Sequence, residues 1–210
     1  MFRRSDPLRA LVLLVPLAVL TAPARAEVPT PEMEARRVVQ STIDQVLGIL
    51  RNQALSQQAK KDDVEEIAYQ RFDFQLISRL VLAQNWNRFS PNQQIDFVEA
   101  FKKHLSTTYR DTLDNFRDEK ITVENARLEP KGDVTVMTLV RGASGDTKVD
   151  YRMRKLADGW RGIDVIVEGV SLVQNFRSQT QEILSTESPD ALIKRLRDKQ
   201  IKDVAPKGKG

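Results

Sequence analysis

The repeat period of the apolar residues changes near residue 121, and this change constrains the fold more than any other feature. Before Ile121, apolar residues recur every three or four positions, as on one face of an α-helix. From Ile121 to Glu168 the period is two, which is typical of β-strands with one buried face. From Leu172 onward the helical period returns. Helices, then consecutive strands, then helices predict an α+β domain.

Four strands are expected in the middle section. They cover residues 121–129, 133–141, 147–155 and 160–168. The segments between them are short and contain glycine, so we expect tight turns and an antiparallel meander. In the third strand Val149, Tyr151 and Met153 alternate with charged residues. This alternation predicts a sheet with one face in water and the other covered by helices.

Three Ser/Thr-Pro pairs mark expected helix starts. They are Thr30-Pro31, Ser90-Pro91 and Ser188-Pro189. In each pair the hydroxyl caps the helix and proline occupies its first position, and Gln93 completes a capping box after the second pair. Helical spacing then continues to Phe116, which predicts one long amphipathic helix. The other expected helical regions cover residues 39–50, 64–80 and 172–184.

The N-terminal segment has the pattern of a secretory signal peptide. Residues 1–9 are basic, residues 10–20 are apolar, and a small-x-small sequence ends at Ala26. The apolar run is short for a membrane span, which takes about 20 residues. We therefore expect cleavage after Ala26 and a periplasmic location. The expected divisions are a signal peptide over 1–26, a single domain over 27–204 and a disordered tail over 205–210.

Composition excludes most familiar catalytic sites. The sequence contains no Cys and one His. The lack of Cys excludes a disulfide scaffold, an iron–sulfur cluster, a thiolate zinc site and a Cys nucleophile. One His excludes a metal site built on two or three His residues of one chain. We therefore expect no metal, no cofactor and no enzyme activity.

The basic character of the full chain comes largely from its N-terminal segment. The net charge is +4 for the whole sequence, and residues 1–26 hold four Arg and one Asp. The rest of the chain carries 29 basic and 28 acidic residues. Because it is nearly neutral, we expect no nucleic-acid partner.

His104 and Asp164 are two titratable residues that could be candidates for a functional site. His104 follows Lys102 and Lys103, so we expect it on the solvated side of the long helix. Asp164 stands in an apolar strand, where a buried carboxyl can act as a general acid with a raised pKa. More often such a carboxylate accepts structural hydrogen bonds from neighbouring backbone or Trp N–H groups, and we favour that interpretation.

The chain carries more apolar surface than one sheet can cover. The expected second strand is apolar on both faces over residues 134–140, and each expected helix has a wide apolar stripe. A tightly filled core accounts for this pattern. A cavity for an apolar ligand accounts for it as well, because such pockets are lined by aliphatic and aromatic side chains. Hydrophobic periodicity does not separate the two.

Two stretches of the sequence resemble the MlaC family. The first contains Phe72-Asp73-Phe74, Leu82, Trp86, the run Ser90-Pro91-Asn92-Gln93-Gln94, Phe97, Phe101 and Tyr109. The second and more specific stretch runs from Gly159-Trp160 to Arg177-Ser178. The resemblance covers about residues 32–185. It departs from the family pattern at Ala83, where Gly is expected, and at Phe176, where Tyr is common.

The resemblance implies a periplasmic phospholipid-binding component of an Mla-type ABC transport system, also called a toluene-tolerance protein. Such a protein is a monomeric shuttle that holds a glycerophospholipid as cargo and maintains outer-membrane lipid asymmetry. Its implied partners are an outer-membrane lipoprotein–porin complex and an inner-membrane Mla transporter complex with an MCE-domain subunit. The transporter, and not this chain, would hydrolyse ATP. The implied fold is a four-stranded meander, covered on one face by helices, that encloses an apolar pocket.

The expected pocket residues come from the sheet and from the helices. The expected sheet face consists of Val136, Val149, Tyr151, Met153, Val165 and Val167. The expected helical wall and mouth consist of Leu76, Leu80, Phe101, Leu105 and Tyr109, with Val170 and Phe176 near the mouth. Trp86 and Trp160 are expected to be structural and to bridge helices to the sheet. Two alternatives remain open: a periplasmic chaperone or adaptor that binds apolar protein segments, and an enzyme that uses Asp164.

Overall fold

The computed structural model describes residues 28–143 and 145–202. Its helical elements are α1 (Pro31–Arg51), α2 (Gln57–Arg71), α3 (Phe74–Leu82), η1 (Ala83–Arg88), α4 (Pro91–Arg110), η2 (Asp111–Asn115), α5 (Leu172–Thr186) and α6 (Pro189–Arg197). Its strands are β1 (Lys120–Leu128), β2 (Val134–Gly142), β3 (Gly145–Leu156), β4 (Gly159–Val167) and β5 (Val170–Ser171). The signal peptide expected over 1–26 and the tail expected over 205–210 lie outside the described residues.

The three helix starts marked by Ser/Thr-Pro pairs are confirmed. The Thr30 hydroxyl accepts a hydrogen bond from the backbone N–H three residues further on, and so does the Ser188 hydroxyl. At the start of α4 the Ser90 hydroxyl accepts from the Gln93 N–H, and the Gln93 side chain accepts from the Ser90 N–H at 3.0 Å. These bonds satisfy backbone donors that a helix leaves unpaired at its first turn.

The helical region expected over residues 64–80 is two helices. Phe72 and Asp73 separate α2 from α3, and the Asp73 carboxylate caps α3 by accepting from the Leu76 N–H at 2.8 Å. Phe72 forms a parallel bridge with Gly162 of β4, whose carbonyl accepts from the Asp73 N–H at 3.1 Å. A side-chain Cβ at Gly162 would lie 2.6 Å from the Phe72 ring. The Phe72 ring can therefore approach β4 this closely because residue 162 is a glycine.

The strands form one antiparallel meander in the order β1-β2-β3-β4-β5. The expected meander is confirmed, but the sheet has five strands rather than four. The extra strand, β5, has two residues and pairs with the end of β4 after a turn at Glu168 and Gly169, both with positive φ. Two residues are too few for an alternation of apolar and polar side chains to reveal a strand. The α-helical part of α4 also ends at Arg110, and a 3₁₀ turn replaces its expected extension to Phe116.

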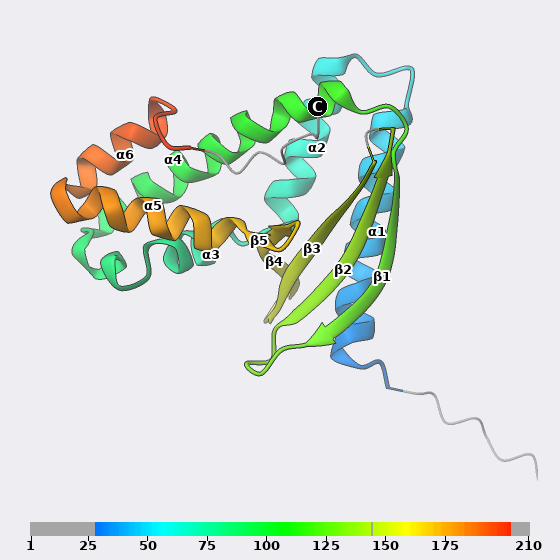
Figure 1. Ribbon diagram of the computed structural model, residues 1–210, viewed down its shortest axis with the longest axis horizontal. Helices are drawn as coiled ribbons and strands as arrows, with labels where there is room; N and C mark the ends of the chain where they lie inside the picture. The colour runs from blue at the N-terminus through cyan, green and yellow to red at the C-terminus, as the bar shows by residue number, and fades with distance from the viewer. Residues whose placement is uncertain (1–27, 144, 203–210) are drawn as a thin grey trace, which may run out of the picture.

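The sheet register places the apolar residues of neighbouring strands on one face. Val136, Tyr151 and Val165 lie side by side in one row across β2, β3 and β4. α1 crosses this face over β1 and β2, and α3, α4, α5 and α6 gather beyond β4 (Figure 1). α2 lies between α1 and this group of helices (Figure 1).

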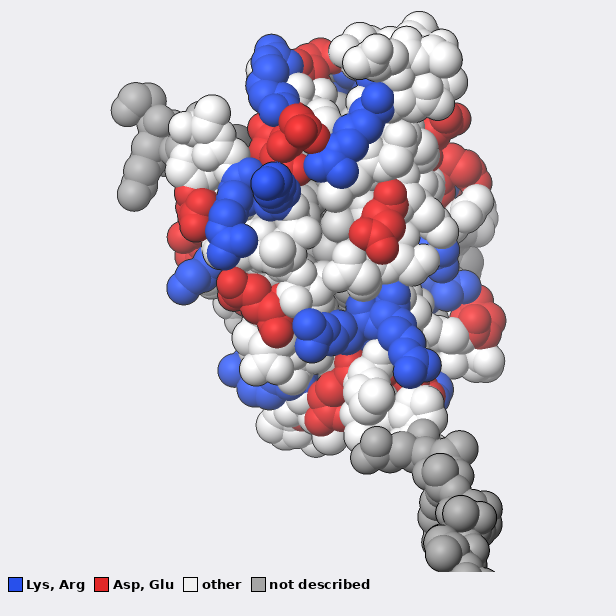
Figure 2. Space-filling view, turned by 90° about the vertical axis from the view of Figure 1, so that its right-hand side faces the viewer, with Lys and Arg blue, Asp and Glu red and all other residues white. Residues whose placement is uncertain are grey.

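Two hydrophobic cores result from this arrangement. The α1–sheet core packs α1 residues such as Val39 and Ile43 against Val134 and Val136 of β2. The helical core joins α3, α4, α5 and α6 and contains Phe97, among other buried residues. The surface formed by the side of the sheet and α1 carries basic and acidic side chains interspersed with one another (Figure 2). The mixture on that surface agrees with the nearly neutral composition of residues 27–210.

Candidate functional site

A cavity of about 490 Å³ lies between the two cores, and its wall is mainly apolar. The sheet contributes Thr147, Val149, Tyr151, Asp164, Val165 and Val167. α2, α3 and the residue Phe72 between them contribute Lys61, Val64, Glu65, Ala68, Tyr69, Phe72, Phe74 and Ile77. α4, η2 and α5 contribute Phe101, Leu105, Ser106, Tyr109, Arg110, Thr112, Leu113, Leu172, Val173 and Phe176. Its volume falls within the range typical of ligand sites.

Regular secondary structure gives each wall its lining. On β3 and β4 every second residue points to the helix-covered face, which places Val149, Tyr151 and Val165 on the cavity. On α2 the lining residues are spaced by three, one, three and one positions from Lys61 to Tyr69, which is one face of a helix. The apolar interior therefore follows directly from the two hydrophobic periods of the sequence.

One end of the cavity is closed by aromatic rings. Phe101 of α4 and Phe176 of α5 are each 1% exposed, and their ring centroids lie 5.1 Å apart in an edge-to-face arrangement. Phe101 also stacks on Phe97, with centroids 5.7 Å apart. At the other end the lining includes the exposed Thr112 and the charged Lys61. The lining therefore extends from buried aromatic side chains of the helical core to exposed or charged residues of α2 and η2, where we place the mouth of the cavity.

The structure places eight of the thirteen predicted pocket residues on the cavity wall. They are Phe101, Leu105, Tyr109, Val149, Tyr151, Val165, Val167 and Phe176. These residues come from four elements, and the cavity is where they converge. Whether they contact a ligand remains a prediction.

The other five predicted residues are not part of this cavity wall. Val136 and Met153 share the correct sheet face, but α1 covers them and they belong to the α1–sheet core. Leu76 and Leu80 miss the cavity because α3 turns Ile77 toward it instead. Val170 is 46% exposed beside the turn between β4 and β5.

Sequence reasoning missed the lining contributed by α2 and its junction with α3. The missed apolar residues there include Val64, Ala68, Tyr69 and Phe72. A signal was present, since Val64, Ala68 and Phe72 follow one another at four-residue spacing. The surrounding charged residues hid this stripe, and α2 contains no fully buried side chain.

Asp164 is a buried structural acceptor. It is 3% exposed, and its carboxylate accepts hydrogen bonds from the Ser171 hydroxyl and from the Val173 N–H at 3.1 Å. The Arg152 guanidinium lies 3.7 Å away. These contacts tie β4 to the first turn of α5, and the backbone donor agrees with the structural interpretation of Asp164. No group of three or more His, Asp or Glu residues in the described part of the chain is arranged to hold a metal ion.

The expectation for His104 was wrong. His104 is 2% exposed and its ring meets Phe176 edge to face, with centroids 5.8 Å apart. The reason is helical phase, because His104 lies three residues after Phe101 and shares its buried face. Lys102 and Lys103 belong to other faces of α4, so the charge of neighbours in the sequence was misleading.

The two Trp residues have different roles. Trp160 is 5% exposed, and its indole N–H donates to the Glu34 carboxylate of α1 at 3.0 Å. It therefore bridges a helix to the sheet, as expected. Trp86 packs against the helical core, with the Arg79 guanidinium 5.7 Å from its ring centroid. The helix-to-sheet contact expected of Trp86 is replaced by contacts among helices.

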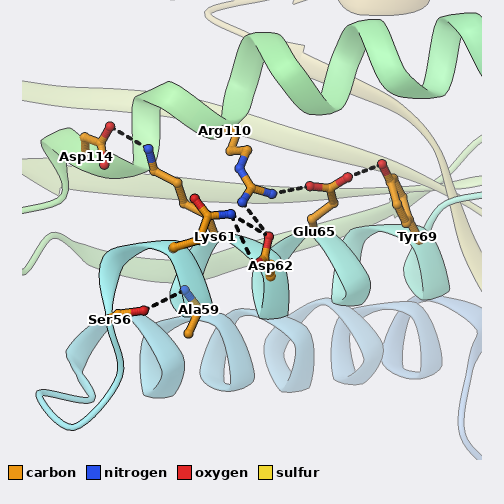
Figure 3. A network of polar contacts seen from close by, with 9 residues as sticks. Ser56, Ala59, Lys61, Asp62, Glu65, Tyr69, Arg110 and Asp114 are labelled. Atoms are coloured by element: carbon orange, nitrogen blue, oxygen red, sulfur yellow. Dashed lines mark hydrogen bonds and ion pairs between the residues drawn. The ribbon is translucent and has the colours of Figure 1, made fainter.

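Charged side chains connect α2 to the end of α4 (Figure 3), and three of them, Lys61, Glu65 and Arg110, also line the cavity. Arg110 at the end of α4 forms ion pairs with both Asp62 and Glu65 of α2. Glu65 also accepts a hydrogen bond from the Tyr69 hydroxyl. The side chains of Arg110 and Glu65 are 19% and 18% exposed, whereas that of Asp62 is 56% exposed. The Arg110–Glu65 contact is thus the more sheltered of the two.

Two further contacts extend the link between α2 and the end of α4. The Lys61 ammonium lies 2.6 Å from the Asp114 carboxylate of η2 (Figure 3). The Lys102 ammonium of α4 lies 3.9 Å from the centroid of the Tyr69 ring, a cation–π contact. Together with the Arg110 ion pairs they form what we call the α2–α4 seam, consisting of Lys61, Asp62, Glu65, Tyr69, Lys102, Arg110 and Asp114.

The seam carboxylates have lowered pKa values. The hydrogen bond from Arg110 lowers the pKa of Asp62. For Glu65, burial alone raises the pKa, but hydrogen bonds from Tyr69 and Arg110 contribute to a net lowering. The contact with Asp62, followed by that with Glu65, raises the pKa of Arg110. All three groups are therefore charged at neutral pH.

The fold and the cavity together define a one-sheet α+β protein with an internal apolar site of the kind that takes small, largely apolar ligands. A sequence profile described as the MlaC protein matches residues 40–198. Since this is well over half of the sequence, the chain belongs to the MlaC family. The resemblance drawn from the two sequence stretches is thereby confirmed.

Two known proteins illustrate the similarity. The toluene tolerance protein ttg2D of Pseudomonas putida is 28% identical over 188 residues, which cover 86% of this chain and 83% of that protein. A phospholipid-binding protein from Ralstonia solanacearum, solved in complex with a phospholipid at 1.53 Å resolution, superposes with a TM-score of 0.71. That match is 24% identical and covers 80% of this chain and 98% of the other, and it shows the fold. Within the described residues, no helix combines the length and apolar character needed to cross a bilayer.

Proposed function

We propose that this protein binds a glycerophospholipid with its acyl chains inside the cavity and carries it through the periplasm between the outer and inner membranes. The observation that carries the proposal is the cavity, about 490 Å³ in volume and walled by aliphatic and aromatic side chains. Membership of the MlaC family supports it. The phospholipid bound by the Ralstonia protein of similar fold supports the same ligand class.

The energetics of lipid transfer explain why a carrier needs such a cavity. Each methylene exposed to water costs about 0.8 kcal/mol, so two tails of about fifteen carbons face on the order of 20 kcal/mol outside a membrane. A carrier must cover most of that surface. It must also release the lipid, so its affinity cannot greatly exceed that of a bilayer. An apolar wall without strong directional contacts meets both conditions.

The polar side of the cavity suggests weak headgroup selection. Three charged residues that line the cavity, Lys61, Glu65 and Arg110, are already engaged in the seam. The fourth, Asp164, is engaged by Ser171, Val173 and Arg152. A headgroup placed at the mouth would compete with those contacts instead of completing an open site. We infer that the acyl chains supply most of the binding free energy and that different glycerophospholipids are accepted.

The cellular setting follows from the same proposal. Residues 1–26 would export the chain to the periplasm, where it acts as a monomer without a cofactor. It would dock in turn on an outer-membrane lipoprotein–porin complex and on the MCE-domain subunit of an inner-membrane Mla transporter. The transporter would hydrolyse ATP, and this chain would act as a carrier and not as an enzyme. The result would be maintenance of outer-membrane lipid asymmetry.

The lining residue Leu105 provides a direct test. In the variant Leu105→Asp a carboxylate would face the acyl chains, and a charge without partners is costly in an apolar site. We expect at least about a tenfold loss of the phospholipid that the protein takes up from vesicles. The matched control is Ile95→Asp on the same helix, because Ile95 is 65% exposed and outside this cavity.

Both variants must first be shown to unfold cooperatively on heating. This control shows that they are folded, so a loss of lipid uptake does not result from misfolding. Leu105→Asp carrying as much lipid as the unmodified protein would contradict the proposal. So would an unmodified protein that takes up no phospholipid but suppresses the aggregation of denatured proteins. That second result would establish the chaperone alternative.

A further inference from the structure

The cavity is bounded by walls of different strength. The sheet wall is held by the antiparallel ladder between β3 and β4, which is interrupted only by a register shift at Arg152 and Met153. The far end is closed by the nearly unexposed Phe101 and Phe176. Opening either one would break several backbone hydrogen bonds or expose a packed core, and each such loss is costly.

The α2–α4 seam is held by a different kind of contact. The contacts across it include the ion pairs of Arg110, the Lys61–Asp114 pair and the Lys102–Tyr69 contact. Pairs that are partly exposed contribute little net free energy, because water solvates the separated charges well. Behind these contacts lie the apolar side chains of both helices, including Val64, Ala68 and Leu105.

α2 also packs only weakly against either hydrophobic core. None of its side chains is fully buried, although α1 and α4 each contain at least four buried residues. Its C-terminal end is fixed to the sheet through Phe72 and Gly162, and at its N-terminal end Lys60 donates to the Leu50 carbonyl of α1 at 2.7 Å. α2 lies between α1 and α4 (Figure 3), so separation from α4 would leave these two attachments in place.

We propose that acyl chains enter and leave the cavity sideways through the α2–α4 seam, and that Arg110 controls the rate by holding the seam closed. This inference rests on the proposed lipid-carrier function. Parting the two helices exposes charged groups to water and opens the apolar interior along its length. A lipid with two tails then enters without breaking the sheet or the aromatic end. Arg110 sets the rate of exchange and contributes little to the affinity for acyl chains.

The test measures transfer of a pyrene-labelled phosphatidylglycerol from vesicles of phosphatidylethanolamine and phosphatidylglycerol. The variant Arg110→Gln should exchange lipid about fivefold faster, with little change in the amount bound at equilibrium. Arg110→Lys should recover part of the slow exchange, because it keeps the charge but not the fork-shaped donor. Added salt should speed the unmodified protein more than Arg110→Gln, since salt screens partly exposed ion pairs.

A double-mutant cycle identifies the contact responsible. If Arg110 acts through Glu65, the double variant Glu65→Gln with Arg110→Gln should exchange lipid no faster than Arg110→Gln alone. The matched control is Arg197→Gln, because Arg197 forms an exposed ion pair between helices, 3.2 Å from Asp96 and away from the cavity. That variant should exchange lipid at the unmodified rate.

Amide hydrogen exchange provides a second test of the seam that needs no lipid. In Arg110→Gln the amides of α2 and of the second half of α4 should exchange faster, while those of β3 and β4 keep their protection. Unchanged transfer rates in Arg110→Gln, or faster exchange in β3 and β4 instead of α2, would overturn the seam as the entry route. An unmodified protein that takes up no lipid would overturn the carrier function. The pattern of amide hydrogen exchange would still test whether Arg110 holds α2 against α4.

Discussion

Tyr151 lies in the cavity wall, where its phenol is held among apolar side chains of the sheet. Burial raises the pKa of Tyr151 to about 12 from an ordinary value of 10. The shift has a single physical cause, because removal from water penalises the phenolate more than the phenol. The pKa of Tyr151 thus depends on how far the cavity wall excludes water.

The raised pKa makes the stability of the fold depend on alkaline pH. The folded protein keeps the Tyr151 proton while the unfolded chain loses it, so this contribution is complete below pH 10 and decreases as the pH approaches 12. Between pH 9 and pH 12 the free energy of unfolding should fall by about 1–2 kcal/mol more in the unmodified protein than in the variant Tyr151→Phe. Urea unfolding at several pH values measures the difference. Equal losses in the two proteins would show that Tyr151 is well hydrated.

At the scale of the elements, the junction between α2 and α3 positions the helical wall of the cavity. Phe72 lies against the backbone of Gly162, lines the cavity and joins α2 to the edge of β4. Asp73 then begins α3 with a new cap. Because this point fixes the end of α2, a change here should disturb both the sheet edge and the cavity.

Gly162 allows a direct test of that contact. In Gly162→Ala the new methyl group would lie 2.6 Å from the Phe72 ring, so the ring or the strand must move. We expect a loss of about 1–3 kcal/mol in the free energy of unfolding. Gly48→Ala in the interior of α1 is the matched control, because no heavy atom outside its chain neighbours and the adjacent backbone of α1 lies within 4 Å of its new methyl group. Alanine there should raise stability by up to about 1 kcal/mol.

A loss at Gly162 no larger than the change at Gly48 would contradict the close approach of Phe72. Denaturant unfolding of both variants with the same slope as the unmodified protein keeps the comparison valid.

The elements differ in how well their sequences predict them. The capped helices and four of the five strands could be predicted, because caps and alternation are local signals. The break at Phe72 and Asp73 could not, because Phe72, Leu76 and Leu80 continue a helical spacing through it. Strand alternation identified the correct face for Val136 and for Tyr151 alike. Only the position of α1, which is set by tertiary packing, decides that Val136 is covered while Tyr151 lines the cavity.

At the scale of the whole molecule, two cores enclose a space that neither fills. The α1–sheet core and the helical core each bury a continuous set of apolar residues, and the cavity lies between them. The apolar surplus of the sequence is thereby explained without a single filled interior. A protein that only needed to be stable would gain by filling this space, because cavities reduce stability. The space is therefore best explained as a site for an apolar ligand.

Native mass spectrometry of the exported chain, purified from the periplasm without detergent, tests this account most directly. We predict a mass above that of residues 27–210 by one or two diacyl lipids, identified as glycerophospholipid after extraction. The Leu105→Asp variant, prepared in the same way, should carry much less. A protein whose mass stays bare after incubation with phospholipid vesicles would contradict the account.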